Sequence, residues 1–185
     1  IRDSVKHHLD YWTTGYGGKQ VSYTPDGMAW LFNWGSLRHV TTTAFIAKIA
    51  SDTILADDKT LVDKYDTWAK SQMDYAFGDN DLGMSYVLGM GDKNPVNVHH
   101  RTSSGIYDDH WNELGSSEPS DKWETTYAHT LYGALEGGPN QDGTFTDTNA
   151  SYQNTEVAID YNAGFTAALC AMIDDLSLIH ISEPT

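Results

Sequence analysis

The sequence predicts an all-α fold, and three observations support this prediction. Apolar residues recur at helical spacing in several segments of the 185-residue chain, and loops rich in Gly, Asn and Asp separate these segments. Alternating β patterns are scarce, and the short run SYVLGM at 85–90 is the one candidate strand. The length suits a single domain with one sizeable core.

Two helices are expected in the first half of the chain, after an amphipathic and charged N-terminal stretch. Ser36 is expected to cap the first, whose apolar stripe begins with Leu37 and Val40. Thr60 is expected to cap the second, and Gly78 would end it.

Two further helices are expected in the second half. One covers 123–135, and its apolar residues at i, i+4 and i+8 are Tyr127, Leu131 and Leu135. The last runs from about Thr155 to Leu176 and contains the single cysteine, Cys170, which we expect in the core. One cysteine excludes an internal disulfide bond.

The charge balance limits the classes of partner. A net charge of −15 argues against binding to nucleic acid or to anionic membranes, both of which require clustered Lys and Arg. No apolar run is long enough to cross a bilayer. A neutral polymer such as a polysaccharide is compatible with this charge, and simple solubility is the alternative explanation. Six Trp and eleven Tyr offer ring faces for stacking on sugars, although most are expected in the core. No cofactor is expected.

The segment FTDTNASYQNTEVAIDYNA, residues 145–163, carries the strongest functional signal. It places two carboxylates, Asp147 and Glu156, on either side of an aromatic residue, Tyr152. A carboxyl group beside aromatic rings is a candidate proton donor, and glycoside hydrolysis requires two acids acting on one bond. Calcium ligation is an alternative use of these acids and amides, but the EF-hand pattern is not met. Asn149 also begins a glycosylation sequon, which we expect to be unmodified if the site is catalytic.

Two other segments carry candidate binding residues. The run SYVLGMGDKNPVNVHHRTSSG, residues 85–105, delivers His99 and Arg101 side by side, suited to hydrogen bonding with sugar hydroxyls. A surface basic patch or a weak metal site is the alternative, but no metal-ligand spacing such as HExxH is present. Trp34, before Gly35 and a predicted helix, and Trp12 in LDYWTTG are candidate stacking platforms, with core packing as the alternative.

These segments, in this order, resemble glycoside hydrolase family 9, the cellulase family of endoglucanases, over about residues 5–174. The resemblance implies the later, C-terminal part of an (α/α)6 barrel and hydrolysis of β-1,4-glucan with inversion. Glu156 would be the general acid, and Asp147 would organise its surroundings. The resemblance implies four further site residues, which would contact the sugar chain: His99, Arg101, Trp34 and Tyr161. Trp12 would be a weaker stacking candidate.

The chain also departs from the family pattern. Glu136 stands where the family usually has an apolar residue. The Asp-x-Gly-Asp motif that carries the family's catalytic base does not occur in this sequence. We therefore expect residues 1–176 to be a C-terminal portion of a catalytic domain, with the acid but not the base, apolar helix faces exposed, and little or no hydrolysis on its own. Residues 177–185 resemble translated adapter or vector sequence and are expected to be a non-native tail, with a genuine short extension as the alternative.

Two other functions remain open at this point. A non-catalytic glucan-binding protein of the same fold would keep the binding residues and lose the chemistry. A different (α/α) toroid enzyme, such as a polysaccharide lyase, would share the helices but not the ordered set of motifs. For the endoglucanase, secretion to the extracellular space is expected from the substrate alone.

Overall fold

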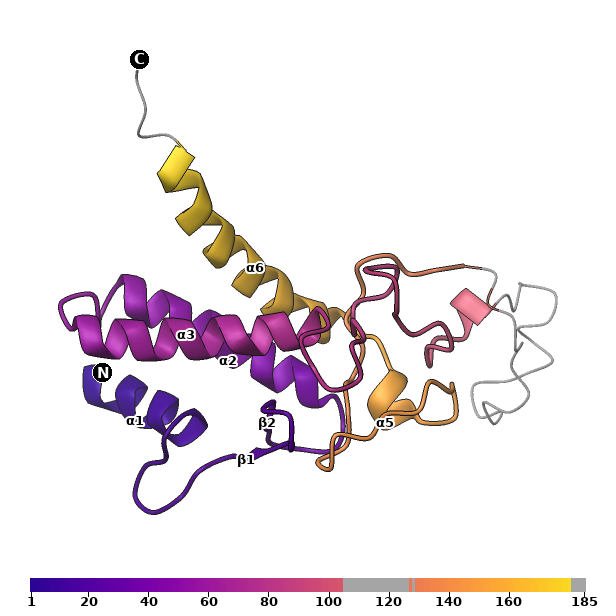
Figure 1. The fold of residues 1–185 in the computed structure, drawn as a ribbon, viewed down its shortest axis with the longest axis horizontal. Helices are drawn as coiled ribbons and strands as arrows, with labels where there is room; N and C mark the ends of the chain where they lie inside the picture. The colour runs from indigo at the N-terminus through magenta and orange to yellow at the C-terminus, as the bar shows by residue number, and fades with distance from the viewer. Residues whose placement is uncertain (105–126, 128, 181–185) are drawn as a thin grey trace.

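The computed structural model describes residues 1–104, 127 and 129–180, with the backbone alone at residues 104 and 174–180 (Figure 1). The described chain is mainly helical, as predicted, with one small hairpin. Its elements are α1 (Arg2–Trp12), β1 (Ser22–Tyr23), β2 (Ala29–Trp30), α2 (Ser36–Asp52), α3 (Lys59–Ala76), the 3-10 turn η1 (Thr102–Ser104), α5 (Tyr152–Thr155) and α6 (Ile159–His180).

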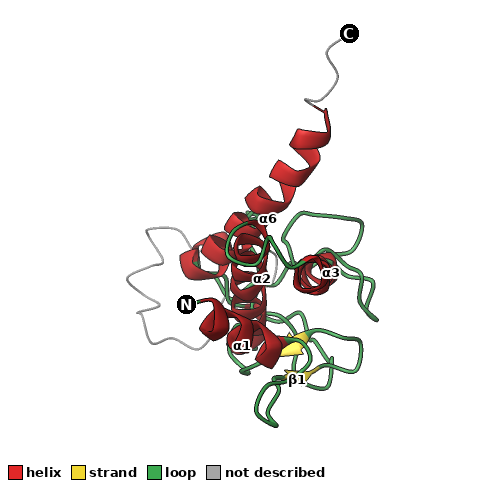
Figure 2. Ribbon diagram, turned by 90° about the vertical axis from the view of Figure 1, so that its left-hand side faces the viewer, coloured by secondary structure: helices red, strands yellow, loops and turns green. Residues whose placement is uncertain are grey.

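Helix α2 lies at the centre of the fold and contacts both α3 and α6 (Figures 1 and 2). Gly164 of α6 faces Thr42 of α2 so closely that a Cβ at Gly164 would lie 2.1 Å from the Thr42 hydroxyl oxygen. A glycine is therefore required where these two helices meet.

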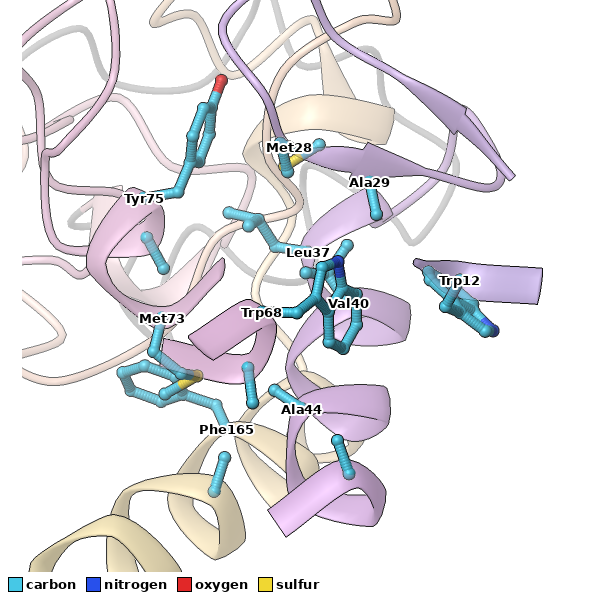
Figure 3. Packing of buried hydrophobic residues seen from close by; sticks show 14 of the residues in the cluster. Trp12, Met28, Ala29, Leu37, Val40, Ala44, Trp68, Met73, Tyr75 and Phe165 are labelled. Carbon is cyan, nitrogen blue, oxygen red and sulfur yellow. The ribbon is translucent and has the colours of Figure 1, made fainter. Parts of the chain in front are cut away.

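The hydrophobic core fills the space between α2, α3 and α6 (Figure 3). Its members include Trp12, Met28, Leu37, Val40, Ala44, Trp68, Met73 and Phe165. The antiparallel hairpin β1–β2 contributes Ala29 to this core. A hydrogen bond also ties it to α3, because the backbone N–H of Ala29 donates to the buried Gln72 side chain at 2.8 Å. By contrast, α2 leaves Ile46 and Ile49 exposed, which agrees with the expected open apolar helix faces.

The helix starts differ from the predicted caps. Asp58 rather than Thr60 caps α3, and its carboxylate accepts from the backbone N–H of Leu61. Ser36 is the first residue of α2 instead of its cap, and its hydroxyl donates to the carbonyl of Gly137 or Pro139. Ser36 therefore ties the helix start to a distant loop.

The predicted helix over 123–135 is wrong where the structure describes it, because 127 and 129–135 form turns and extended chain. Leu135 is buried, but through a β-bridge with Val87, so the run at 85–90 contributes an isolated bridge and no strand. The last helix begins at Ile159 and not at Thr155. Cys170 is exposed, which corrects its expected place in the core.

Helix α6 continues to His180, so the predicted boundary at 176 falls inside a helix. Residues 181–185 lie outside the described residues, and the non-native origin of 177–185 stays a prediction. None of the helices in the described part of the chain is long and apolar enough to span a lipid bilayer.

Candidate active site

Glu156 lies at a break between two helices. Helix α5 ends at Thr155, Glu156 is extended with φ −68° and ψ 143°, and α6 begins three residues later. Two loops hold this short extended segment by β-bridges, one between His99 and Glu156 and one between Glu136 and Val157. The backbone N–H of His99 also donates to the Thr155 carbonyl at 2.8 Å. These bridges and this hydrogen bond therefore fix the backbone of Glu156 at the end of the fold where the loops gather (Figure 1).

Two neutral donors orient the Glu156 carboxyl group. Trp34 Nε1 donates to Oε2 at 2.6 Å, and the Tyr161 hydroxyl donates to the same oxygen at 3.0 Å. Both donors use Oε2, and no group in the described chain bonds Oε1. A proton carried by this carboxyl group is therefore left to Oε1, where it would be available to a substrate.

Aromatic rings surround this carboxyl group. Trp34 packs edge-on against Tyr152 with ring centroids 5.0 Å apart, and Tyr152 lies 5.8 Å from the His99 ring. Trp34 and Tyr152 are each 39 % exposed, so both rings remain accessible beside the carboxyl group. Tyr152 was part of the sequence motif but was not predicted as a site residue.

Asp147 connects the two signature loops. Its carboxylate oxygens accept from the backbone N–H groups of Val96 and Asn97, each at 2.9 Å, and from the Asn97 side chain at 3.3 Å. Asp147 therefore ties the 85–105 loop to the 145–163 segment, and its role in organising the surroundings of Glu156 stays a prediction. Asn97 is a contributor that the sequence did not reveal.

His99 and Arg101 follow directly in the same loop. His99 Nδ1 lies 2.5 Å from the Asn149 carbonyl oxygen, and because a carbonyl can only accept, Nδ1 carries a proton. Arg101 is half-buried and directly precedes η1, two residues beyond His99. Backbone pairing thus places His99 beside Glu156. Arg101 follows two residues later in the same loop.

Gly35 explains how Trp34 and Tyr161 reach one oxygen. Gly35 has φ +63°, and a Cβ there would lie 2.6 Å from Cζ of Tyr161. Its N–H donates to the Gln153 carbonyl at 2.9 Å, which binds the start of α2 to α5. The lack of a side chain at position 35 therefore leaves room for the Tyr161 ring against the backbone just before α2.

Two predicted sugar contacts are not presented to a ligand in this structure. Trp12 is 3 % exposed and packs edge-on against Trp68 at 6.2 Å, so it belongs to the core. Tyr161 is 1 % exposed, and burial followed by the Glu156 charge raises the pKa of its hydroxyl. In this structure the buried Tyr161 hydroxyl bonds Glu156, and its predicted contact with a sugar stays a prediction.

No group of three or more His, Cys, Asp or Glu side chains gathers as a metal site within residues 1–104, 127 and 129–180. The geometry instead offers a carboxyl group with one oriented and one unbonded oxygen, exposed aromatic faces, and an imidazole. These parts suit proton donation to a bound carbohydrate.

Comparison with known proteins decides the family. The model of glycosyl hydrolase family 9 matches residues 1–169. The chain belongs to glycosyl hydrolase family 9. It is 41 % identical to endoglucanase A of Bacillus pumilus over 175 residues, covering 92 % of this chain and 25 % of that protein. It is 35 % identical to an endoglucanase of Dictyostelium discoideum over 169 residues, covering 91 % of this chain and 21 % of that protein.

Solved structures of family 9 enzymes have the same fold. Endoglucanase CelQ from Clostridium thermocellum, complexed with cellotriose, matches with a TM-score of 0.78 at 45 % identity, over 90 % of this chain and 26 % of CelQ. The endoglucanase of the termite Nasutitermes takasagoensis matches with a TM-score of 0.73 at 35 % identity, over 93 % of this chain and 36 % of the termite chain. These neighbours are (α/α)6 barrels, so the fold prediction is confirmed as a partial barrel. The chain spans about a quarter of the length of the curated bacterial endoglucanases it matches.

Proposed function

We propose that the protein carrying this chain is an endo-β-1,4-glucanase that hydrolyses internal bonds of cellulose or a related glucan with inversion. The single observation that carries the proposal is the Glu156 carboxyl group, which Trp34 and Tyr161 orient through Oε2 and whose Oε1 bonds no group among the described residues. Family membership and the endoglucanase relatives support the reaction class. The cellotriose bound to CelQ supports the substrate class.

In this proposal Glu156 is the general acid. It protonates the leaving glycosidic oxygen from Oε1 while Trp34 and Tyr161 hold the other oxygen. Trp34 and Tyr152 offer exposed ring faces for sugar stacking. His99 and Arg101 donate to the hydroxyls of the glucose unit next to the cleaved bond.

Inversion also needs a base that activates water on the opposite face of the sugar, with the two carboxyl groups roughly 6.5–9.5 Å apart. The sequence lacks the Asp-x-Gly-Asp motif, so we propose that residues outside this chain supply the base. The 185-residue chain alone is then expected to hydrolyse little or no glucan. Extracellular secretion belongs to the same proposal, since its support is the polymeric substrate.

The test is Glu156→Gln in the full-length protein that carries this sequence. The glutamine Oε1 can still accept from Trp34 and Tyr161, but its amide cannot donate a proton to the leaving group at useful rates. We expect turnover of soluble cello-oligosaccharides to fall by about 10²-fold or more while their binding is retained. Asp92→Asn, which removes an exposed carboxylate from the 85–105 loop, is the matched control and should keep the parent activity.

Turnover of Glu156→Gln near the parent rate would refute the acid assignment. Binding of cellotriose without any turnover by the unsubstituted full-length protein would instead indicate a glucan-binding protein of the same fold.

A further inference from the structure

A second glutamate, Glu136, lies buried beside this site. It is 0 % exposed, and neither carboxyl oxygen has a hydrogen-bond partner in the described part of the chain. The hydroxyl of the fully buried Tyr86 likewise has no partner there, and the backbone N–H of Glu136 donates to the Tyr86 carbonyl at 3.1 Å. Natural proteins rarely leave a buried polar group unsatisfied, so this carboxyl group needs a physical explanation.

An ionised carboxylate in this position would be strongly unfavourable, because no hydrogen-bond donor among the described residues compensates for its lost hydration. Burial, and then the negative charge of Asp147, raise the pKa of Glu136 well above its ordinary value of 4.5. Tyr86 and Tyr127 are the other titratable groups on which the Glu136 charge acts. Neither tyrosine offers a positive charge. The folded state therefore favours the neutral acid form of Glu136 at pH values where an ordinary glutamate is already ionised.

The position of Glu136 connects this neutral acid to both functional carboxylates. Its backbone bridges Val157, the residue directly after Glu156. Its side chain senses the charge of Asp147, whose carboxylate holds the Val96–Asn97 turn. A negative charge on Glu136 would thus act on Asp147, which holds the Val96–Asn97 turn, and on the backbone next to Glu156, the proposed acid.

We propose that Glu136 is a proton-binding positioning residue: as a neutral acid it bridges the segment that follows Glu156 without repelling Asp147, and its ionisation loosens both. Proton loss adds a second negative charge near Asp147, which loosens the 96–97 turn. It also draws water toward the buried Glu136 side chain, which loosens the bridge to Val157. An apolar residue at position 136 would pack in the same place without this sensitivity to pH. The activity part of this proposal rests on the proposed function, and the proton-binding part does not.

The experiment compares the full-length protein with Glu136→Gln, which imitates the protonated acid and cannot ionise. Glu136→Leu is a second variant, and the exposed Asp92→Asn is a control. Infrared spectroscopy at neutral pH should show a protonated carboxylic acid band that Glu136→Gln lacks and Asp92→Asn keeps. If a variant fails to fold, the absence of this band from the unsubstituted protein would still overturn the proposal.

The second readout is the pH dependence of unfolding. A group whose folded pKa is raised releases its proton more easily in the unfolded chain, so stability is fully present below 4.5 and is lost as pH rises through the folded pKa. Across that window the unfolding constant of the parent should gain up to tenfold per pH unit relative to Glu136→Gln. Parallel curves would overturn proton binding by Glu136.

The third readout is the pH profile of glucan turnover. Glu136→Gln should match the parent at acid pH and keep a larger share of its activity on the alkaline side. Identical profiles, with the infrared and unfolding differences present, would reduce Glu136 to a structural residue and overturn the positioning role. Absence of turnover in every version would refute the proposed function, while the first two readouts would still decide the proton-binding proposal.

Discussion

Substitution of Gly35 by alanine should damage the site and the fold together. Gly35 has φ +63°, a conformation that costs a residue with a Cβ roughly 1–2 kcal/mol. The new Cβ would also lie 2.6 Å from both Cζ and the hydroxyl oxygen of Tyr161. The ring has little room to retreat, because its hydroxyl bonds Glu156 and Arg38 lies over its face at 5.2 Å. Such overpacking adds about 1–3 kcal/mol, so the total loss is about 2–5 kcal/mol.

Gly17→Ala provides the matched control. Gly17 has φ +60°, but a Cβ there would meet no atom within 4 Å, so this variant isolates the cost of the backbone conformation. Urea unfolding of the full-length protein should show the larger loss for Gly35→Ala, by about 1–3 kcal/mol. The displaced Tyr161 and Trp34 should also lower glucan turnover by up to about 10²-fold, whereas Gly17→Ala should leave turnover unchanged. Equal stability losses with unchanged turnover in both variants would refute the steric argument.

Two further predictions concern stability. Burial alone would raise the pKa of Asp10, but hydrogen bonds from Lys6, Lys64 and Tyr65 outweigh it and lower this pKa from 3.8 to about 2. The associated stability, ~2 kcal/mol, is present above pH 3.8 and lost as pH falls toward 2, and urea unfolding of Asp10→Asn should lack this acid-side decline. Gly164→Ala would bring a Cβ within 2.1 Å of a threonine hydroxyl of α2, and should lower stability by about 1–3 kcal/mol. An unchanged melting temperature for Gly164→Ala would contradict the close approach of α2 and α6.

The helices that the sequence predicted correctly are those whose apolar periodicity is satisfied by packing on other helices. The α2 stripe buries Leu37 and Val40 in the core, as their spacing indicated, and α3 packs Trp68 into the same core. The spacing over 123–135 was misleading because Leu135 is buried by pairing with Val87, a contact distant in sequence that periodicity cannot reveal. Apolar periodicity thus predicts a helix correctly here only where the apolar residues pack against another helix.

The same limit applies to the site. The loops that carry the motif residues Glu156, Asp147 and His99 are joined by a β-bridge and by hydrogen bonds between side chains and the backbone. The sequence ranked Trp12 below Trp34 as a stacking candidate but could not show that Trp12 packs in the core while Trp34 remains exposed, because burial depends on contacts distant in sequence. It also gave no indication that the Tyr161 ring would lie against Gly35, because that contact joins residues far apart in the chain.

The choice of donors to Glu156 has a chemical consequence. An arginine fork would engage both carboxylate oxygens and favour the charged form, which suits a binding residue better than a proton donor. Here an indole and a phenol, both neutral, share one oxygen. The nearby cation Arg38 lies over the Tyr161 ring and pairs with Asp160 at 3.0 Å. The two hydrogen bonds thus fix the orientation of the Glu156 carboxyl group through one oxygen, and Arg38 makes its ion pair with Asp160 instead.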